Sequence, residues 1–222
     1  MGKRIVLFGG SFDPIHQGHV KIIKLLSEKF DFVYVIPTNV EGYKKNCKMF
    51  SFGERCKKVQ EAVKGLDNVV VSYIEEHADP SYQFVSSAKF YKEQFDGEDV
   101  ELYFALGSDS FATIKTWDGW EEIISYCKIA VINRDGNYVL PKDIPYELID
   151  FHDESSSTLI RQKVEKQIND YKAVTDPLTK ILRVNEFHSF CDENNLVHSI
   201  ENYVRYMNKN DFPLNLKELL TI

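Results

Sequence analysis

The sequence has few cysteines, no long hydrophobic run and no strongly basic region. Its four cysteines are scattered, without a C-x-x-C pair, which in a chain of 222 residues predicts reduced thiols and a cytoplasmic protein. No apolar run approaches the roughly 18 residues that a membrane span needs, so no membrane partner is expected. The net charge is −7 and the single basic cluster, Lys44, Lys45 and Lys48, is short. A nucleic-acid partner is therefore not expected either.

The overall composition is that of a globular protein. Apolar residues make up 43% and charged residues 27% of the chain, which excludes a disordered chain, a coiled coil and a collagen-like repeat. The first residues run from a short apolar stretch directly into Gly and Asp, so they predict a strand and not a secretory signal. We expect one domain over residues 1–196 and a helical tail over 197–222 that packs on it. A homo-oligomer remains open.

Short apolar runs alternate with amphipathic stretches along the chain. Period and composition predict strands at 3–8, 32–37, 68–74, 100–107, 127–133 and 146–151. They predict helices at 20–30, 51–64, 84–95, 117–126 and 157–170, and a further helix from 176. Ser51 and Glu54 have the S-x-x-E spacing of a capping box. This alternation predicts an α/β fold, a doubly wound and mostly parallel Rossmann-like sheet flanked by helices, with a helical C-terminal region.

The segment Gly9–His19, GGSFDPIHQGH, follows the first predicted strand and opens the first predicted helix. Ligands of an open parallel sheet bind at the carboxyl ends of its strands, and a helix N-terminus favours phosphate. His16 and His19 are three residues apart and can share one face of the helix. Two imidazoles there suit a polyphosphate that gains charge during reaction. A simple turn after the strand and a metal site are the alternatives, although zinc needs three or four ligands.

Two further segments follow later strands. Ser155–Arg161 opens a predicted helix, where hydroxyl groups cap free N–H groups or those N–H groups bind phosphate. A serine cap with a surface arginine is the alternative. Gly107 ends the fourth strand, Asp109 can accept hydrogen bonds from ribose hydroxyls, and Trp117 can stack on a flat heterocycle. For Trp120 we favour core packing.

These segments resemble known motifs. GGSFDPIHQGH resembles the G-G-[ST]-F-D-P-x-H-x-G-H signature of the nucleotidylyltransferase superfamily, with Ser11 where many members have Thr. SSTLIR resembles the I-S-S-T-x-I-R motif of nicotinate-nucleotide adenylyltransferases, with Ser155 in place of Ile. The spacing from Gly107 through Asp109 to Trp117 is similar to the same family. The stretch after the second strand lacks the second proline and the histidine of the family's P-x-x-x-P-x-H-K, and Gln83 replaces a Thr.

The resemblance implies an enzyme that joins ATP to nicotinate mononucleotide, forming deamido-NAD and pyrophosphate in NAD biosynthesis. It implies catalytic roles for His16, His19 and Arg161. It implies phosphate contacts for Gly9, Gly10, Ser11, Phe12, Lys44, Ser156, Ser157 and Thr158. It implies nucleotide or pyridine contacts for Asn39, Tyr82, Gln83, Gly107, Asp109, Trp117 and Arg134.

The implied cofactor is Mg²⁺, held mainly by substrate phosphates and waters, with no metal ligands from the protein. A preference for nicotinamide mononucleotide, another acceptor such as phosphopantetheine, and a non-catalytic nucleotide sensor are the alternatives. The retention of His16, His19 and Arg161 disfavours the sensor.

Overall fold

The computed structural model describes residues 2–39, 50–77, 83–133 and 138–151, with isolated positions between 162 and 189. The chain forms two compact units, Met1–Glu154 and Ser155–Ile222. Nearly all described residues belong to the first unit. The boundary predicted at residue 196 and the predicted tail lie outside the described residues and stay predictions. None of the described helices is long and apolar enough to cross a membrane.

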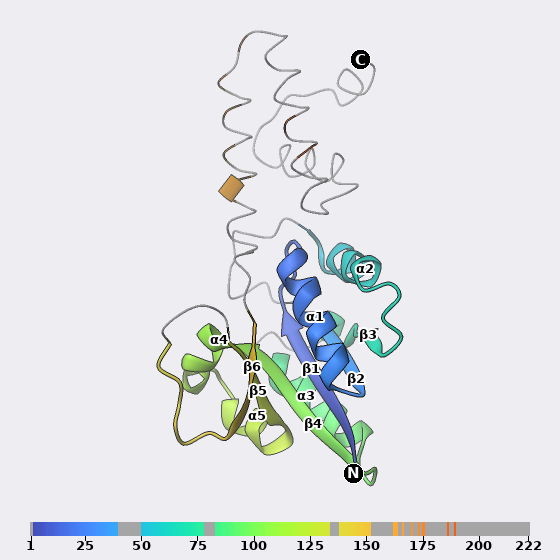
Figure 1. Ribbon diagram of the computed structural model, residues 1–222, viewed down its shortest axis with the longest axis vertical. Coiled ribbons are helices and arrows are strands. Elements are labelled where there is room, and N and C mark those ends of the chain that lie inside the picture. The colour runs from blue at the N-terminus through green and yellow to red at the C-terminus, as the bar shows by residue number, and fades with distance from the viewer. Residues whose placement is uncertain are drawn as a thin grey trace. The chain divides into compact units, whose positions relative to one another are not determined.

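The described strands of the first unit form one parallel sheet of six strands (Figure 1). They are β1 (Lys3–Gly10), β2 (Phe32–Pro37), β3 (Val69–Val71), β4 (Val100–Gly107), β5 (Lys128–Asn133) and β6 (Tyr146–Asp150). Their order is β3-β2-β1-β4-β5-β6, and every neighbouring pair is parallel. In this order the direction in which strands are added reverses between β1 and β4, as in a doubly wound fold. The predicted Rossmann-like fold is therefore confirmed.

Helices cover both faces of the sheet because side chains of a strand alternate between its two faces. The helical segments are α1 (Gln17–Lys29), α2 (Phe52–Ala62), η1 (Ile74–His77), α3 (Gln83–Gln94), α4 (Ser108–Ala112), η2 (Ile114–Thr116) and α5 (Trp120–Tyr126), where η marks a 3₁₀ turn. Val6 and Phe8 of β1 join one buried cluster with side chains of α1 and α2. Ile5 and Leu7 join the other with side chains of α3, α4 and α5.

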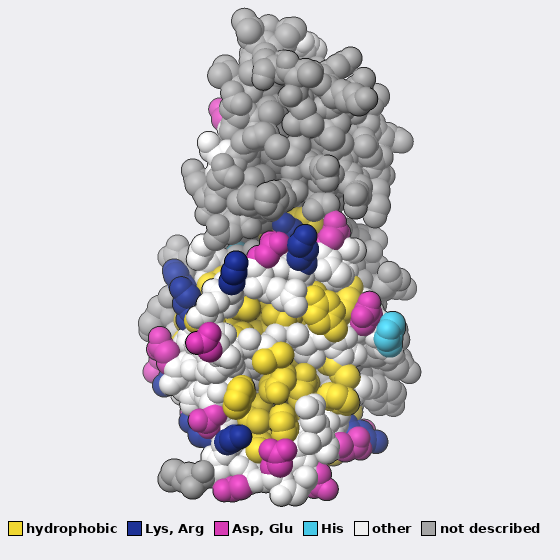
Figure 2. Space-filling view, turned by 90° about the vertical axis from the view of Figure 1, so that its right-hand side faces the viewer, with side chains coloured by type: hydrophobic (Ala, Val, Ile, Leu, Met, Phe, Trp, Pro, Cys, Tyr) yellow, Lys and Arg dark blue, Asp and Glu magenta, His cyan; other side chains and the backbone are white. Residues whose placement is uncertain are grey.

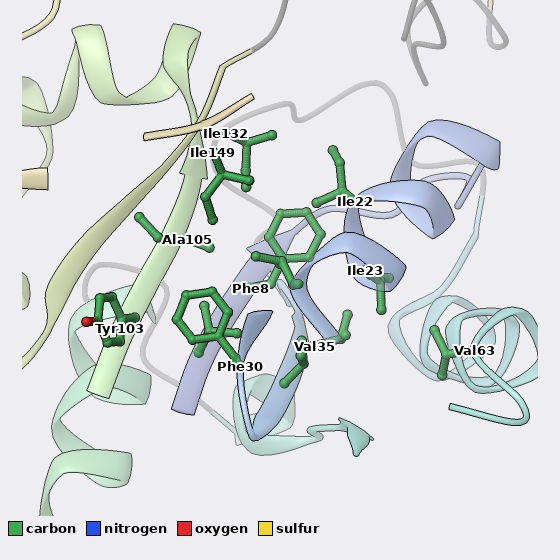
Figure 3. Close-up of a cluster of buried hydrophobic side chains, with 14 of the residues drawn as sticks. Phe8, Ile22, Ile23, Phe30, Val35, Val63, Tyr103, Ala105, Ile132 and Ile149 are labelled. Carbon is green, nitrogen blue, oxygen red and sulfur yellow. The ribbon is translucent and has the colours of Figure 1, made fainter. Parts of the chain in front are cut away.

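Phe8 packs the strand that leads into the candidate phosphate-binding loop between β1 and α1. It lies opposite Ala105 of β4 in the sheet register and packs in the cluster that includes Ile22 and Ile23 of α1 (Figure 3). Ile22 and Ile23 are fully buried, and burying an isoleucine side chain contributes about 1.5–3 kcal/mol. This packing fixes α1 against β1, and with it the loop that joins them.

Several predicted boundaries differ from the structure by one to three residues, as where α1 starts at Gln17 and not at residue 20. Two of the differences have a local cause. β3 ends at Val71 because the Ser72 hydroxyl accepts a hydrogen bond from the Ile74 N–H at 3.3 Å, and the chain turns into η1. The helix expected from Trp117 starts at Trp120, since Gly119 has φ 73° and breaks the path. Trp117 instead is the C-cap residue that follows η2. Both differences arise at local turns, which the period of the hydrophobic residues does not predict.

The capping box is present at the start of α2. Glu54 accepts a hydrogen bond from the Ser51 N–H at 2.9 Å, and the Ser51 hydroxyl accepts one from the Glu54 N–H at 3.4 Å. Figure 2 views the side of the molecule that carries α2 and β3, where hydrophobic side chains gather among acidic and basic ones. Val70 of the edge strand β3 is exposed there. Because β3 has only three residues, little backbone is open to pairing with another chain.

Candidate active site

The candidate site lies where β1 and β4 end. Phe8 pairs with Ala105 in parallel register, so Gly9 and Gly10 emerge at the same edge of the sheet as Gly107. The sheet reverses its direction of strand addition at this point, which opens a crevice for ligands in folds of this class.

Several contacts hold residues Gly10–His16, the end of β1 and the loop before α1, in place. The Gly10 carbonyl accepts a hydrogen bond from the Thr38 N–H at 2.9 Å. Phe12 has φ 47°, a left-handed conformation that costs energy for a residue with a side chain. Its ring is buried and lies 5.7 Å from that of Phe8. Asp13 is also buried and accepts a hydrogen bond from the Phe50 N–H at 3.0 Å. The loop conformation is thus set by contacts on both sides of Phe12.

The two histidines lie together at the start of α1. His16 is the N-cap residue and is buried, while His19 is half-buried in the first turn. Their ring centroids are 3.8 Å apart and their planes are 30° apart, so the imidazoles stack. The ring of Phe12 meets that of His19 edge-on at 4.9 Å. Because a helix N-terminus carries free N–H groups and partial positive charge, this pair is suited to an anion.

A row of aromatic rings continues from the loop along the crevice. A Cβ atom at Gly9 would lie 2.3 Å from Cε1 of Phe84, so the Phe84 ring lies directly against the Gly9 backbone. Phe84 also contacts Trp117, which is stacked on it with centroids 5.5 Å apart and planes 22° apart. Trp117 is half-buried. A flat heterocycle beside the phosphate loop would find an aromatic surface here.

Comparison with known proteins identifies the family. The cytidylyltransferase-like family matches residues 7–163. A protein of Solibacter usitatus named "Probable nicotinate-nucleotide adenylyltransferase" is 30% identical over 150 residues, which cover 66% of this chain and 79% of that protein. The chain belongs to the nicotinate-nucleotide adenylyltransferase family.

Two other relatives of the family extend the comparison. A Pseudomonas aeruginosa protein with the same name is 33% identical over 137 residues, covering 60% of this chain and 63% of that protein. The chain thus matches less than two thirds of the length of this relative. The structure of Plasmodium falciparum nicotinic acid mononucleotide adenylyltransferase complexed with NaAD has a TM-score of 0.63 and 25% identity, covering 86% of this chain and 98% of that one.

The structure gathers several predicted site residues at this crevice and leaves others undescribed. Gly9, Gly10, Ser11, Phe12, His16 and His19 form the end of β1, the loop and the start of α1. Gly107 is the N-cap of α4, and Asp109 is exposed in its first turn. Asn39 donates a hydrogen bond to the Glu76 carbonyl at 2.8 Å, so part of its amide is engaged by η1. Gln83 begins α3. Lys44, Tyr82, Arg134, Ser156, Ser157, Thr158, Arg161 and the side chain of Gln83 lie outside the described residues.

Three residues of this region were not predicted as site residues. Phe84 was assigned only to a helix, yet it connects Gly9 to Trp117. Arg55 is fully buried behind the loop. The only signal in the sequence is its position, four residues before the buried Val59 on α2. Glu75 is fully buried in η1. The period of the sequence does not say which partners such side chains meet.

Glu75 has an interior environment unusual for a carboxyl group. It is fully buried, and one oxygen accepts a hydrogen bond from the Ser87 hydroxyl. Its other oxygen, Oε2, makes no hydrogen bond with the described residues. Burial raises the pKa of Glu75, and the hydrogen bond from Ser87 opposes that rise. Folding therefore shifts the equilibrium of this carboxyl towards its neutral form, relative to the unfolded chain.

We expect the Glu75→Gln variant to gain stability relative to the natural protein as pH rises. An unfolded glutamate ionises near pH 4.3, while the folded pKa of Glu75 is higher. The stability that Glu75 contributes is full below the unfolded pKa and is lost as pH rises through the folded pKa. Glutamine stays neutral and lacks this loss. Urea unfolding of both proteins between about pH 4.5 and 8 measures the difference.

Glu101→Gln provides a control of opposite sign. The hydrogen bond from Lys128, then that from Tyr103, lowers the pKa of Glu101. The stability from that group is therefore present above the unfolded pKa and is lost as pH falls through the folded pKa. A Glu75→Gln variant whose relative stability stayed flat, or fell, as pH rose would show that Glu75 is ionised in the folded protein.

Proposed function

We propose that this protein is an adenylyltransferase that joins ATP to nicotinate mononucleotide, releasing pyrophosphate and forming deamido-NAD. The observation that carries the proposal is the stacked pair His16 and His19 at the N-terminus of α1, beside the end of the central strand. Membership in the nicotinate-nucleotide adenylyltransferase family supports it. The named acceptor of the relatives favours nicotinate over nicotinamide mononucleotide.

The proposed reaction is an in-line displacement at phosphorus. A phosphate oxygen of the mononucleotide attacks the α-phosphorus of ATP, a new P–O bond forms, and the bond to the β-phosphate oxygen breaks as pyrophosphate leaves. The attacking oxygen is ionised at neutral pH, so no general base is needed. Catalysis then depends on alignment and on stabilising the charge that develops on the phosphates.

The described residues can perform part of this work. His16 and His19 would contact oxygens of the α- and β-phosphates, and the N-terminus of α1 would add its partial positive charge. We propose that Arg161, Lys44 and the Ser156–Thr158 segment hold the leaving pyrophosphate. Asp109 would accept hydrogen bonds from a ribose hydroxyl, and Trp117 would stack on the pyridine ring with the face turned away from Phe84.

The proposed cofactor is Mg²⁺, which neutralises phosphate charge when bound. The carboxylate within the loop, Asp13, is buried and accepts a hydrogen bond from the Phe50 N–H. The loop therefore suits a cation held mainly by substrate oxygens and waters, as Mg²⁺ prefers. We also propose a cytoplasmic location, because Cys56 and Cys127 are free thiols.

A direct assay tests the proposed function. The purified protein is mixed with ATP, Mg²⁺ and either nicotinate or nicotinamide mononucleotide, and both pyrophosphate and dinucleotide are measured. We expect equal amounts of pyrophosphate and deamido-NAD, with a higher kcat/KM for the nicotinate substrate. Pyrophosphate formed only with phosphopantetheine would assign another acceptor, and none with any acceptor would leave a nucleotide sensor.

Replacing Trp117 by alanine is expected to raise the KM for the mononucleotide roughly 10- to 100-fold with a smaller change in kcat. Stacking of a base on an aromatic ring is worth about 1–3 kcal/mol, and the loss affects binding more than the chemical step. Steady-state kinetics at saturating ATP measures it. Trp120→Ala is the matched control, because Trp120 packs on the same core cluster but is not assigned to the site. An unchanged KM in Trp117→Ala would move the pyridine pocket elsewhere.

A further inference from the structure

Arg55 is a buried cation behind the phosphate-binding loop. It lies on α2, is 2% exposed, and its guanidinium carbon is 5.7 Å from the ring of Phe52. Burial lowers the pKa of Arg55, and the charge of Asp13 opposes that change. Burying a guanidinium group costs free energy unless its charge and its donors are matched. The position therefore needs an explanation beyond core packing.

The contacts of Arg55 lead to the loop. Its Nη1 donates a hydrogen bond of 2.6 Å to the Ser11 carbonyl. The negative charge of Asp13 attracts the guanidinium and opposes the lowering of the Arg55 pKa, and Asp13 accepts a hydrogen bond from the Phe50 N–H. Ser11 and Asp13 are the two neighbours of Phe12, whose backbone is in the left-handed conformation. Arg55 thus acts on both sides of the one strained residue of the loop.

The remaining donors of Arg55 increase the cost of its burial. Nε and Nη2 are buried and make no hydrogen bond with the described residues. A buried polar group left without a hydrogen bond costs about 1–3 kcal/mol. An apolar side chain at this position would avoid that cost, as Val59 does one turn further along the same face of α2. Residues that break local rules in this way concentrate at functional sites.

We propose that Arg55 is a positioning residue for the phosphate loop, holding the Ser11 carbonyl and the Asp13 carboxylate so that Phe12 supports the stacked histidines. The support is direct, because the Phe12 ring meets His19 edge-on at 4.9 Å. The charge of Arg55 also lies close behind a loop that would receive phosphates, which favours an anion. This inference rests on the proposed function for its catalytic readout only, since binding of ATP tests it separately.

The test compares Arg55→Met, Arg55→Lys and Val59→Ala in the full chain. Methionine keeps an unbranched side chain without charge or donors, and lysine keeps a charge and can donate to Ser11. Val59→Ala leaves a cavity one turn along the same helix and controls for lost stability. Three quantities are measured for each: the melting temperature, the Kd of Mg²⁺-ATP by calorimetry without acceptor, and kcat and KM for both substrates.

We expect Arg55→Met to weaken ATP binding and lower kcat, each roughly 10- to 100-fold, because small displacements of positioned groups have effects of that size. The KM for the mononucleotide should change little, and Arg55→Lys should recover part of both losses. Val59→Ala should lower the melting temperature while keeping the Kd of ATP and kcat. The proposal is overturned if a folded Arg55→Met binds ATP as the natural protein does, or if Val59→Ala loses as much ATP affinity as Arg55→Met.

These outcomes separate the two proposals. A natural protein that binds ATP but forms no pyridine dinucleotide contradicts the proposed function and leaves the role of Arg55 to be decided by ATP binding. A natural protein that forms deamido-NAD with undiminished ATP affinity in Arg55→Met contradicts the role of Arg55 alone. If Arg55→Met does not fold, Arg55→Gln takes its place as the uncharged variant, and the same outcomes apply.

Discussion

Replacing His19 by alanine is expected to lower kcat by about 100- to 1,000-fold, the usual cost of removing one group that stabilises transition-state charge. The His19 imidazole is stacked on that of His16 at 3.8 Å and sits in the first turn of α1. In the proposed reaction, its loss would remove a donor from the place where negative charge grows as pyrophosphate departs. The effect should fall on kcat more than on KM, because that charge is absent from the bound substrates.

A folded variant with intact turnover would refute the phosphate assignment. Single-turnover formation of dinucleotide at saturating substrates gives the rate of the chemical step. His77→Ala is the matched control, since His77 is an exposed histidine at the end of η1 and should leave the rate unchanged. His19→Asn keeps a polar side chain beside Phe12 and guards against a loss caused only by repacking. Near-natural rates in both His19 variants would mean that the imidazole has no role in the reaction.

Replacing Gly9 by alanine is expected to destabilise the protein by about 1–3 kcal/mol, the range found for overpacked interiors. The added Cβ would lie 2.3 Å from Cε1 of Phe84. The Phe84 ring has little room to move, because it stacks on Trp117 at 5.5 Å and meets Phe104 edge-on at 5.5 Å. Moving it would disturb the aromatic surface and the end of β1 together, so the KM for the mononucleotide should rise as well.

Gly53→Ala is the matched control for this variant. Gly53 lies in α2, where an added Cβ would meet nothing within 4 Å. Alanine there should be neutral or should stabilise the protein by roughly 0.5–1 kcal/mol, because glycine loses more backbone freedom on folding. Urea unfolding of the three proteins measures both changes. Equal stability of Gly9→Ala and the natural protein would show that the Phe84 ring can move away from the added Cβ, in spite of its contacts.

The sequence predicts the sheet well because each strand is a short apolar run bounded by glycine, proline or polar residues. β2 and β4 have the predicted bounds, and the capping box places the start of α2. Two of the boundary errors fall where a single contact decides the path. The Ser72 hydroxyl ends β3 early, and the left-handed Gly119 delays α5. Such contacts depend on side-chain positions that residue type alone does not give.

The sequence indicates the anion-binding half of the site more clearly than its supports. The spacing of His16 and His19 predicts that they share a face, and the structure stacks them. The link from Gly9 through Phe84 to Trp117 joins segments about 75 and 33 residues apart in the chain, which no local pattern encodes. The sequence does not predict the burial of Arg55 either, since an arginine on a helix normally predicts a solvated face.

The central place of β1 also governs when the protein can acquire its site during synthesis. Lys3 of β1 is paired with Val100 of β4. The first strand therefore cannot pair with its second neighbour until almost half of the chain has been synthesised. A nascent chain that stops before Gly107 can pair β1 with β2 but has only one wall of the crevice. At ribosomal speeds of roughly 5–20 residues per second, that delay lasts several seconds. During it, the unpaired edge of β1 is open to chaperones and to other nascent chains.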